Sequence, residues 1–178
     1  MPTLTADDII TLLTQYGTET GESVDALIVG ALALHAYGIT NRHTRDFDAE
    51  LAGPLTSLLE YLTAHHIPAD LTQNFSGWSI IAMPPGYRDR AIDLINRPNL
   101  RVRVLSPVDF IIAKLRRGTE LDLDDAFLVA RRHQISVETI RASAQTAVAA
   151  SPQDTALFLF NKTVDLFCKD LPPPNREG

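Results

Sequence analysis

The sequence predicts an α+β fold, in which a small mixed sheet is flanked by helices and followed by a C-terminal helical extension. Up to residue 105, strand-like apolar runs alternate with stretches of helical periodicity. Three of these runs are separated only by the turn signals PPG and NRPN, which favours hairpin-like pairing and hence a mixed sheet. From Ser106 onward the pattern is helical. We therefore expect an α/β core over residues 1–105, a helical subdomain over 106–170 and a flexible tail over 171–178.

The elements of the core follow from hydrophobic periodicity and from residues that begin or end helices. The expected order is a helix from Thr5 or Asp7 to about Tyr16, a strand at 26–29, a helix at 31–37, a strand at 45–51, a helix from Pro54 to about His65, and strands at 78–83, 90–95 and 102–105. Gly30 joins the first strand to the second helix. A strand that turns into a helix at a glycine leaves backbone N–H groups that can face an anion.

The helical extension opens with a strong start signal. Ser106 can cap a helix, Pro107 suits its first position and Asp109 its third. This helix runs through Lys114 to Gly118. The further helices are expected from Asp122 to Arg132, from Ser136 onward, and from Pro152 to near Asp170.

Composition excludes several classes of protein. Hydrophobic residues make up 45% and charged residues 21%, as in ordinary globular domains rather than disordered chains. No apolar stretch approaches the roughly 20 residues of a membrane span and no basic leader precedes an apolar run, so we expect a cytoplasmic protein without a membrane partner. The net charge of −6 disfavours indiscriminate nucleic-acid binding, although arginine pairs such as Arg101 and Arg103 leave room for a local basic patch. The single Cys168 excludes an internal disulfide and a cysteine-rich zinc site.

Two carboxylates on one predicted strand carry the strongest chemical signal. Asp46 and Asp48 are two residues apart, so they share a face and repel each other unless a cation or a proton compensates. Asp93 is a further acid in the apolar run AIDLI, where an unpartnered aspartate is unfavourable. If its strand lies beside the first, the three acids can hold one or two Mg²⁺ ions. The alternative is that Asp46 pairs with Arg42 or Arg45 at the surface and Asp93 caps a turn.

The histidines and the tryptophan are weaker candidates. His65 and His66 end a helix, where a cation complements the helix dipole, so we expect both to be structural. His43 lies close to the acids in the sequence, and a phosphate or substrate contact is no better than an even prospect there. Trp78 is expected to pack in the structure rather than to stack on a base.

Two segments resemble a known family. LIVGALALHAYGITNRHTRDFDAEL resembles the opening of minimal nucleotidyltransferases of the AbiEii and DUF6036 type, in which a glycine pair, a helix, a second glycine, an Arg, a Thr or Ser and D-x-D follow one another. VLSPVDFIIAKLRRGTELDLDDAFLVA resembles the family's other signature, a Ser-Pro helix that carries a lysine, followed by D-x-x-D on the next helix. The resemblance spans about residues 24–130 and implies a nucleotidyltransferase fold of the polymerase-beta-like kind.

The resemblance also implies roles for individual residues. Asp46, Asp48 and Asp93 would be the catalytic acids and the ligands of Mg²⁺ or Mn²⁺. Gly30 would belong to a turn that faces the phosphates, and Lys114 would meet the phosphates directly. The full nucleotide-binding set implied is Gly30, Ala31, Arg42, Thr44, Lys114, Asp122 and Asp125.

The implied function is transfer of a nucleotidyl group from a nucleoside triphosphate to a hydroxyl of RNA, such as a tRNA 3′ end, or of a partner protein. Relatives of this type occur in toxin–antitoxin and defence modules. Ala31 stands where the family usually has a second glycine or a serine, and Thr119 and Leu121 stand where Arg and Lys are frequent. These departures leave open a catalytically inactive binding or regulatory module that acts through a protein partner. A metal-dependent phosphohydrolase is a third reading.

Overall fold

The computed structural model describes residues 3–172, which group into two compact units. The α/β unit contains the chain up to Phe75 together with Arg90–Leu105. The helical unit contains Ser76–Asp89 and the chain from Ser106 onward. The chain therefore enters the helical unit twice, and residues 76–89, which the sequence assigned to the core, group with the helices. The tail beyond residue 172 lies outside the described residues.

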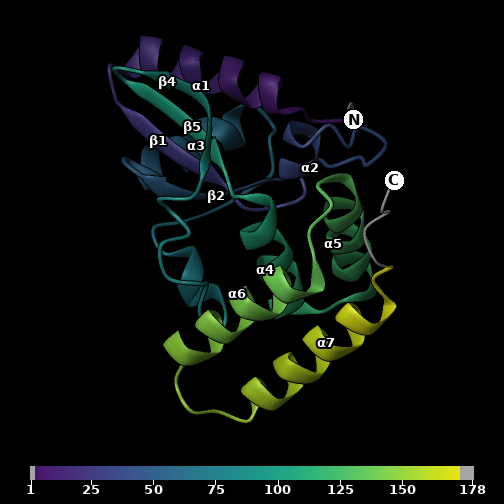
Figure 1. Ribbon diagram of the computed structural model, residues 1–178. Coiled ribbons are helices and arrows are strands. Elements are labelled where there is room, and N and C mark those ends of the chain that lie inside the picture. Colours follow the sequence, from purple (N-terminus) through teal and green to yellow (C-terminus); the bar gives the residue numbers. More distant parts are fainter. Residues whose placement is uncertain (1–2, 173–178) are drawn as a thin grey trace. The chain divides into compact units, whose positions relative to one another are not determined.

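The α/β unit is built on one five-stranded mixed sheet (Figure 1). Its elements are α1 (Ala6–Thr20), β1 (Val24–Ile28), α2 (Ala33–Ala36), β2 (Phe47–Ala52), α3 (Leu55–Ala64), β3 (Ala69–Thr72), β4 (Ile92–Arg97) and β5 (Leu100–Val104). The strand order is β3-β2-β1-β5-β4, with β1 antiparallel to β2 and parallel to β5. β2 and β3 are parallel, whereas β4 and β5 are antiparallel. The expected mixed sheet flanked by helices is thereby confirmed.

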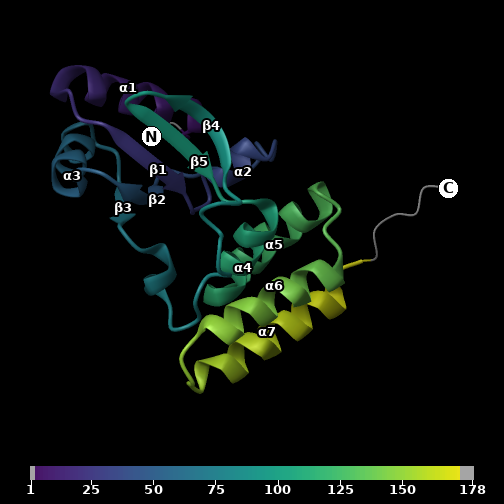
Figure 2. The ribbon, with the colours of Figure 1, turned by 60° about the vertical axis from the view of Figure 1, so that its left-hand side comes forward.

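One face of this sheet is apolar and forms the core. The register aligns Ala26 of β1 with Val102 of β5 and with Leu51 of β2, and all three side chains are buried. Both α1 and α3 lie on the same side of the sheet, since the ring of Tyr16 is 5.1 Å from that of Tyr61 and edge-on to it (Figures 1 and 2). Burial of these side chains is the main favourable term that holds the unit together.

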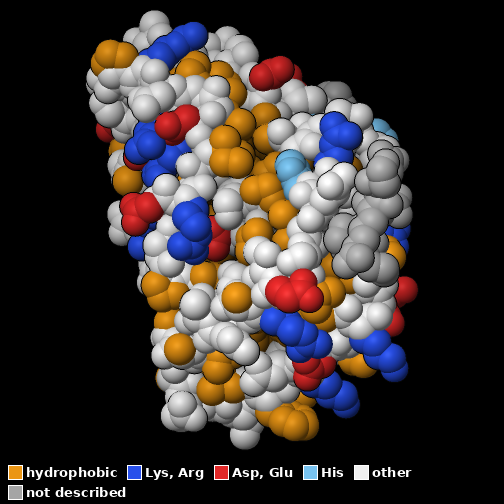
Figure 3. All heavy atoms as spheres, in the orientation of Figure 1, with side chains coloured by type: hydrophobic (Ala, Val, Ile, Leu, Met, Phe, Trp, Pro, Cys, Tyr) orange, Lys and Arg blue, Asp and Glu red, His pale blue; other side chains and the backbone are white. Residues whose placement is uncertain are grey.

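The opposite face of the sheet is polar. Strand side chains alternate between faces, and residues paired directly across neighbouring strands share a face. We call this surface the polar face; it carries Asp25, Asp48, Glu50, Asp70, Asp93, Arg101 and Arg103. At the β4–β5 end the charges form ion pairs, because Arg103 contacts Asp25 at 2.8 Å and Arg101 contacts Asp93 at 2.7 Å. Figure 3, which draws one side of the molecule, likewise shows acidic and basic side chains interspersed.

The helical unit consists of α4 (Pro107–Arg117), α5 (Glu120–Arg132), α6 (Val137–Ala150) and α7 (Ala156–Asp170). α4 packs against the other three helices, and α6 runs beside α7 (Figure 2). Three of the helices begin at a hydroxyl cap, Ser106, Thr119 or Ser136, whose oxygen accepts a backbone N–H three residues later. The predicted cap at Ser106 and the predicted helix start at Ser136 are thus confirmed. Among the described residues, no helix combines the length and apolarity needed to cross a bilayer.

The structure of the segment Ser76–Asp89 differs from the prediction. A strand was expected at Trp78–Met83, but the structure has a 3-10 turn, η1 (Phe75–Trp78), followed by a loop. The loop is held by a side chain and not by pairing with a neighbouring strand. Arg116 donates to the carbonyls of Ser76 and Ile81, both at 2.7 Å. Burial lowers the pKa of Arg116 to about 10. The backbone groups are therefore satisfied by α4 rather than by the sheet.

Candidate functional site

The turn after β1 and the acid of β2 are in direct contact. Val29 donates its N–H to the carbonyl of Asp48 at 3.0 Å, which brings the end of β1 beside β2. A Cβ atom at Gly30 would lie 2.3 Å from Asp48 Oδ2 and 2.7 Å from Asp48 Cβ. Only glycine therefore fits beside this carboxylate. The next residue in the turn, Ala31, is half-buried, and the first backbone donor back to Gly30 is Ala33, at 3.1 Å.

The segment that leads into β2 carries three further residues of the predicted set. Asp46 is exposed and directly precedes β2. Its N–H lies 3.5 Å from the Thr44 hydroxyl, and the Thr44 carbonyl accepts the N–H of Leu4 at 2.9 Å. The carbonyl of Arg42 is bonded to the His35 ring at 2.6 Å. The segment that leads into β2 therefore contains Arg42, Thr44 and Asp46, and these hydrogen bonds hold it in place.

Asp93 does not join these acids. It lies on the edge strand β4, and β5 and β1 separate that strand from β2. With about 4.8 Å between neighbouring strands, three steps amount to about 14 Å, which is too far for a shared ion. Arg101 binds both Asp93 oxygens, at 2.7 and 3.3 Å, and this hydrogen bonding lowers the pKa of Asp93. The condition for Asp93 to share an ion with Asp48, that their strands be neighbours, is therefore not met.

Asp70 occupies the neighbouring position that Asp93 was expected to fill. It lies on β3 directly across from Asp48, so the two carboxylates share the polar face at adjoining strands. Like charges placed directly opposite destabilise a sheet unless a cation compensates. Asp70 is not among the predicted acids, because β3 is only four residues long and follows closely on α3. The available signal was the pattern Ala-Asp-Leu, in which one acid stands between two apolar residues, as in the run around Asp93.

Glu50 supports the same part of the sheet. It lies two residues beyond Asp48 on the polar face, as the alternation predicts, and it is only 7% exposed. Its Oε2 atom accepts the N–H of Phe75 at 2.8 Å, which fixes the chain after β3. Glu50 is thus a positioning residue for the strand that carries Asp70. Within the described part of the chain, no three metal-ligating side chains are already gathered as an ion-binding group.

In the helical unit, Lys114 forms a buried cluster with the two acids of the D-x-x-D signature. Its Nζ atom lies 3.1 Å from Asp122 Oδ1 and 2.9 Å from Asp125 Oδ2. All three residues are at most 7% exposed. Thr119, which stands where Arg is frequent in the family, caps α5 and donates to Asp122 at 2.6 Å. The ammonium group has three N–H donors, so the bonds to Asp122 and Asp125 leave one donor for another contact.

The Asp122 carboxyl predicts a stability change in acid. Burial raises the pKa of this carboxyl. The hydrogen bond from Thr119 and the charges of Lys114 and Arg117 together lower the pKa by more, so the net shift is downward. A folded-state pKa below the unfolded value of about 3.9 stabilises the fold above that pH, and this stability is lost as the pH falls through the folded pKa. We expect urea unfolding, followed by circular dichroism, to show a steep loss of stability below about pH 4 that is shallower in Asp122→Asn. Equal slopes for the two proteins would contradict this assignment.

Comparison with known families places these residues in context. The profile of one family matches residues 6–162, from α1 into α7, and its description is a nucleotidyltransferase of unknown function (DUF6036). Comparisons with curated proteins and with solved structures found no match. The match includes the Gly30 turn, the acids of β2 and β3, and the Lys114 cluster. The chain belongs to the DUF6036 family of nucleotidyltransferases.

Proposed function

We propose that this chain transfers a nucleotidyl group from a nucleoside triphosphate to an acceptor hydroxyl, with the reaction centred where Gly30 meets Asp48. The family supports the general kind of reaction. The observation that carries the proposal is the absence of room for a Cβ atom at Gly30, because Asp48 fills that space. A turn suited to phosphates and a carboxylate suited to a metal ion thus meet at one point.

The acids near this point suit Mg²⁺ or Mn²⁺. Asp48 on β2 and Asp70 on β3 lie side by side, and Asp46 directly precedes β2. Carboxylate oxygens are hard donors of the kind that these ions prefer. When bound, the metal would neutralise charge on the triphosphate and on the leaving pyrophosphate. In this proposal Asp70 takes the part that the resemblance gave to Asp93.

The protein's own residues would mainly position the reactants. In nucleotidyl transfer the acceptor oxygen forms a bond to the α-phosphorus while the bond to pyrophosphate breaks, and the hydroxyl proton must go to a base. Asp46 is exposed and directly precedes β2, and we assign it this proton. The backbone of Gly30 and Ala31 would face the phosphates, and Arg42 would balance their charge. The acceptor that we propose is an RNA, such as a tRNA 3′ end, or a partner protein, as for the AbiEii type in toxin–antitoxin modules.

Calorimetric titration with each nucleoside triphosphate, with and without Mg²⁺, tests the proposal. We expect Mg²⁺-dependent binding of at least one triphosphate, weakened about tenfold or more in Asp48→Asn and in Asp70→Asn. Asp93→Asn is the matched control and should bind as the parent does, because its strand lies at the far edge of the sheet. An equal loss in Asp93→Asn would return that acid to the site. If no triphosphate binds, the proposal fails.

A transfer assay separates the proposal from its alternatives. Labelled nucleotide should appear on RNA or protein, and this product should be lost in Asp48→Asn. Ala31 in the glycine turn favours the alternative of an inactive module. Such a module would bind a protein partner equally well with Asp48 or with Asp48→Asn. Breakdown of the triphosphate without transfer would instead indicate a phosphohydrolase.

A further inference from the structure

A cavity of about 450 Å³ opens in the α/β unit where β2 begins. Its polar wall comes from three separate segments: Thr3 and Asp8 at the start of α1, Arg45 just before β2, and His65 and His66 after α3. A bond of 2.6 Å between the Thr3 hydroxyl and the ring of His43 ties the first segment to the second. The α1 and α3 residues in its wall put the cavity on the helix-covered side of the sheet, whereas Asp48 belongs to the polar face.

The wall of the cavity carries three exposed side chains, Arg45, His65 and His66. Arg45 is exposed and holds no ion pair within residues 3–172. His65 is fixed by a bond of 2.9 Å from Nδ1 to the Tyr61 carbonyl, which leaves Nε2 for another partner. His66 has a φ of 59°, a left-handed conformation that glycine adopts with less strain. A bulky imidazole is therefore held at the cavity in a position where a helix end usually carries glycine.

Asp8 is the acid in this wall, and one of its oxygens is hydrogen-bonded within the start of α1. Its Oδ2 atom accepts the N–H of Thr5 at 2.8 Å and the Thr5 hydroxyl at 2.6 Å, which closes the capping box of α1. The N-terminal end of this 15-residue helix also contributes partial positive charge. The negative end of α3 is covered, because its last carbonyls accept the N–H groups of His65, His66 and Ile67. Arg45 and the start of α1 therefore supply positive charge to the cavity, beside the Asp8 carboxylate.

We propose that this cavity binds a phosphate group, carried by a free nucleotide or by an RNA strand, with Arg45 and His66 donating to its oxygens and His65 beside them. The planar guanidinium of arginine matches the geometry of phosphate. The volume exceeds that of phosphate alone and lies within the usual range of ligand pockets, so the attached sugar can enter as well. The site stands independently of the transfer reaction proposed above.

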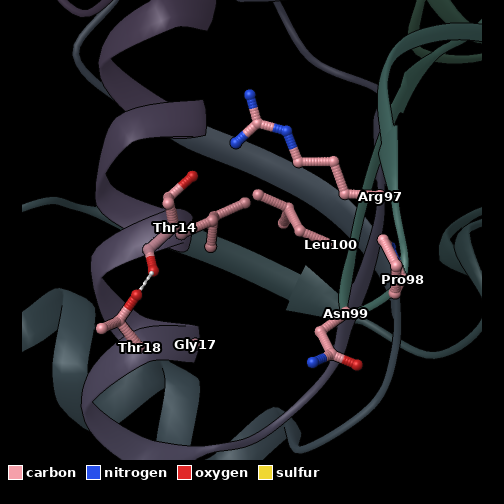
Figure 4. Close-up of a pocket in the computed structure, with 8 residues that line it drawn as sticks. Thr14, Gly17, Thr18, Arg97, Pro98, Asn99 and Leu100 are labelled. Atoms are coloured by element: carbon pink, nitrogen blue, oxygen red, sulfur yellow. Dashed lines mark hydrogen bonds between the residues drawn. The ribbon is translucent and has the colours of Figure 1, made fainter.

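A second cavity provides the comparison. It measures about 360 Å³ and lies between α1 and the β4–β5 turn, with Arg97 as the one charged residue among those that line it (Figure 4). Its hydroxyls are already engaged, because Thr14 donates to Ile10 at 2.7 Å and Thr18 donates to Thr14 at 2.9 Å. It offers an exposed arginine beside a hollow but no imidazole. Arg97→Gln is therefore a matched control for Arg45→Gln.

The test is a titration without divalent ions, using inorganic phosphate, a nucleoside 5′-monophosphate and a short single-stranded RNA. Imidazole resonances in two-dimensional NMR report the location, and calorimetry reports the affinity. We expect the resonances of His65 and His66 to move while that of His133, in the helical unit, stays in place. Arg45→Gln should weaken binding about tenfold, and His66→Asn, which tolerates the left-handed backbone, should also weaken it. Arg97→Gln should have no effect.

The outcomes separate the two sources of phosphate. Binding of the monophosphate as tight as that of RNA indicates a free nucleotide, whereas much tighter RNA binding indicates a strand. The proposal is overturned if no probe moves the His65 and His66 resonances, or if Arg97→Gln weakens binding as much as Arg45→Gln does. Repeating the titration on Asp48→Asn keeps the two proposals apart, because binding in this cavity should survive there when Mg²⁺-dependent triphosphate binding is lost.

Discussion

Lys114→Met is expected to lower the free energy of unfolding of the helical unit by about 3–5 kcal/mol. Asp122 and Asp125 are 2% and 1% exposed, so removal of the lysine leaves two buried carboxylates without their shared cation. Methionine keeps most of the side-chain volume, so the change reports charge rather than packing. Thermal unfolding followed by circular dichroism should show a melting temperature lower by about 10 °C.

Lys162→Met is the control for this prediction. Lys162 is exposed on α7, so its loss should change stability by no more than about 0.5 kcal/mol. A Lys114→Met protein that stays as stable as the parent but loses triphosphate binding would show that the ammonium serves the nucleotide, as the family resemblance implies. A large loss of stability would show that Lys114 chiefly neutralises Asp122 and Asp125.

Gly30→Ala is expected to reduce nucleotidyl transfer about 100-fold. The added methyl group would lie 2.3 Å from Asp48 Oδ2 and 2.8 Å from Asp48 Cγ, so the carboxylate must move by the order of 1 Å. A displacement of that size in a reacting group typically costs about this factor in rate. The same substitution should also weaken Mg²⁺-dependent binding of the triphosphate, measured by calorimetry.

Gly17→Ala serves as the comparison. At that position in α1 the nearest atom to an added Cβ is the Glu22 carbonyl oxygen at 3.3 Å, a contact that a small shift relieves. Alanine also favours a helix over glycine by about 1 kcal/mol, so the fold should hold and transfer should be unchanged. If Gly30→Ala were as active as Gly17→Ala, Asp48 would not be part of the reaction centre.

Local signals in the sequence were sufficient to predict where helices start and which residues of β2 share a face. Ser106 caps a helix and another helix starts at Ser136, both as predicted, because a helix start involves only residues a few positions apart. The alternation that placed Asp48 and Glu50 together is also confirmed, since it depends on the period of a single strand. Contact of Gly30 with Asp48 joins two motifs that the sequence already singled out.

Non-local pairing accounts for what the sequence did not predict. Asp93 and Asp70 stand in similar apolar settings, and only the strand order decides that Asp70 is the neighbour of Asp48. The apolar run at Trp78–Met83 has the composition of a strand, but its carbonyls are taken by Arg116, which lies 35 residues beyond Ile81. Composition and periodicity carry no information about such distant partners.

Two separate segments of the chain, Ser76–Asp89 and the chain from Ser106 onward, form the helical unit. This arrangement affects the order in which the protein can fold during synthesis. Ser76–Asp89 leaves the ribosome before its anchors do, because Arg116 holds its carbonyls and the Ser151 hydroxyl accepts the N–H of Ala82 at 2.8 Å. Ile81 and Met83 are buried in the finished protein, and the helical unit to which they belong is incomplete until its helices have been made. A nascent chain that ends after β5 therefore exposes the apolar loop that connects β3 to β4, and that loop is where a chaperone or a protease would first engage it.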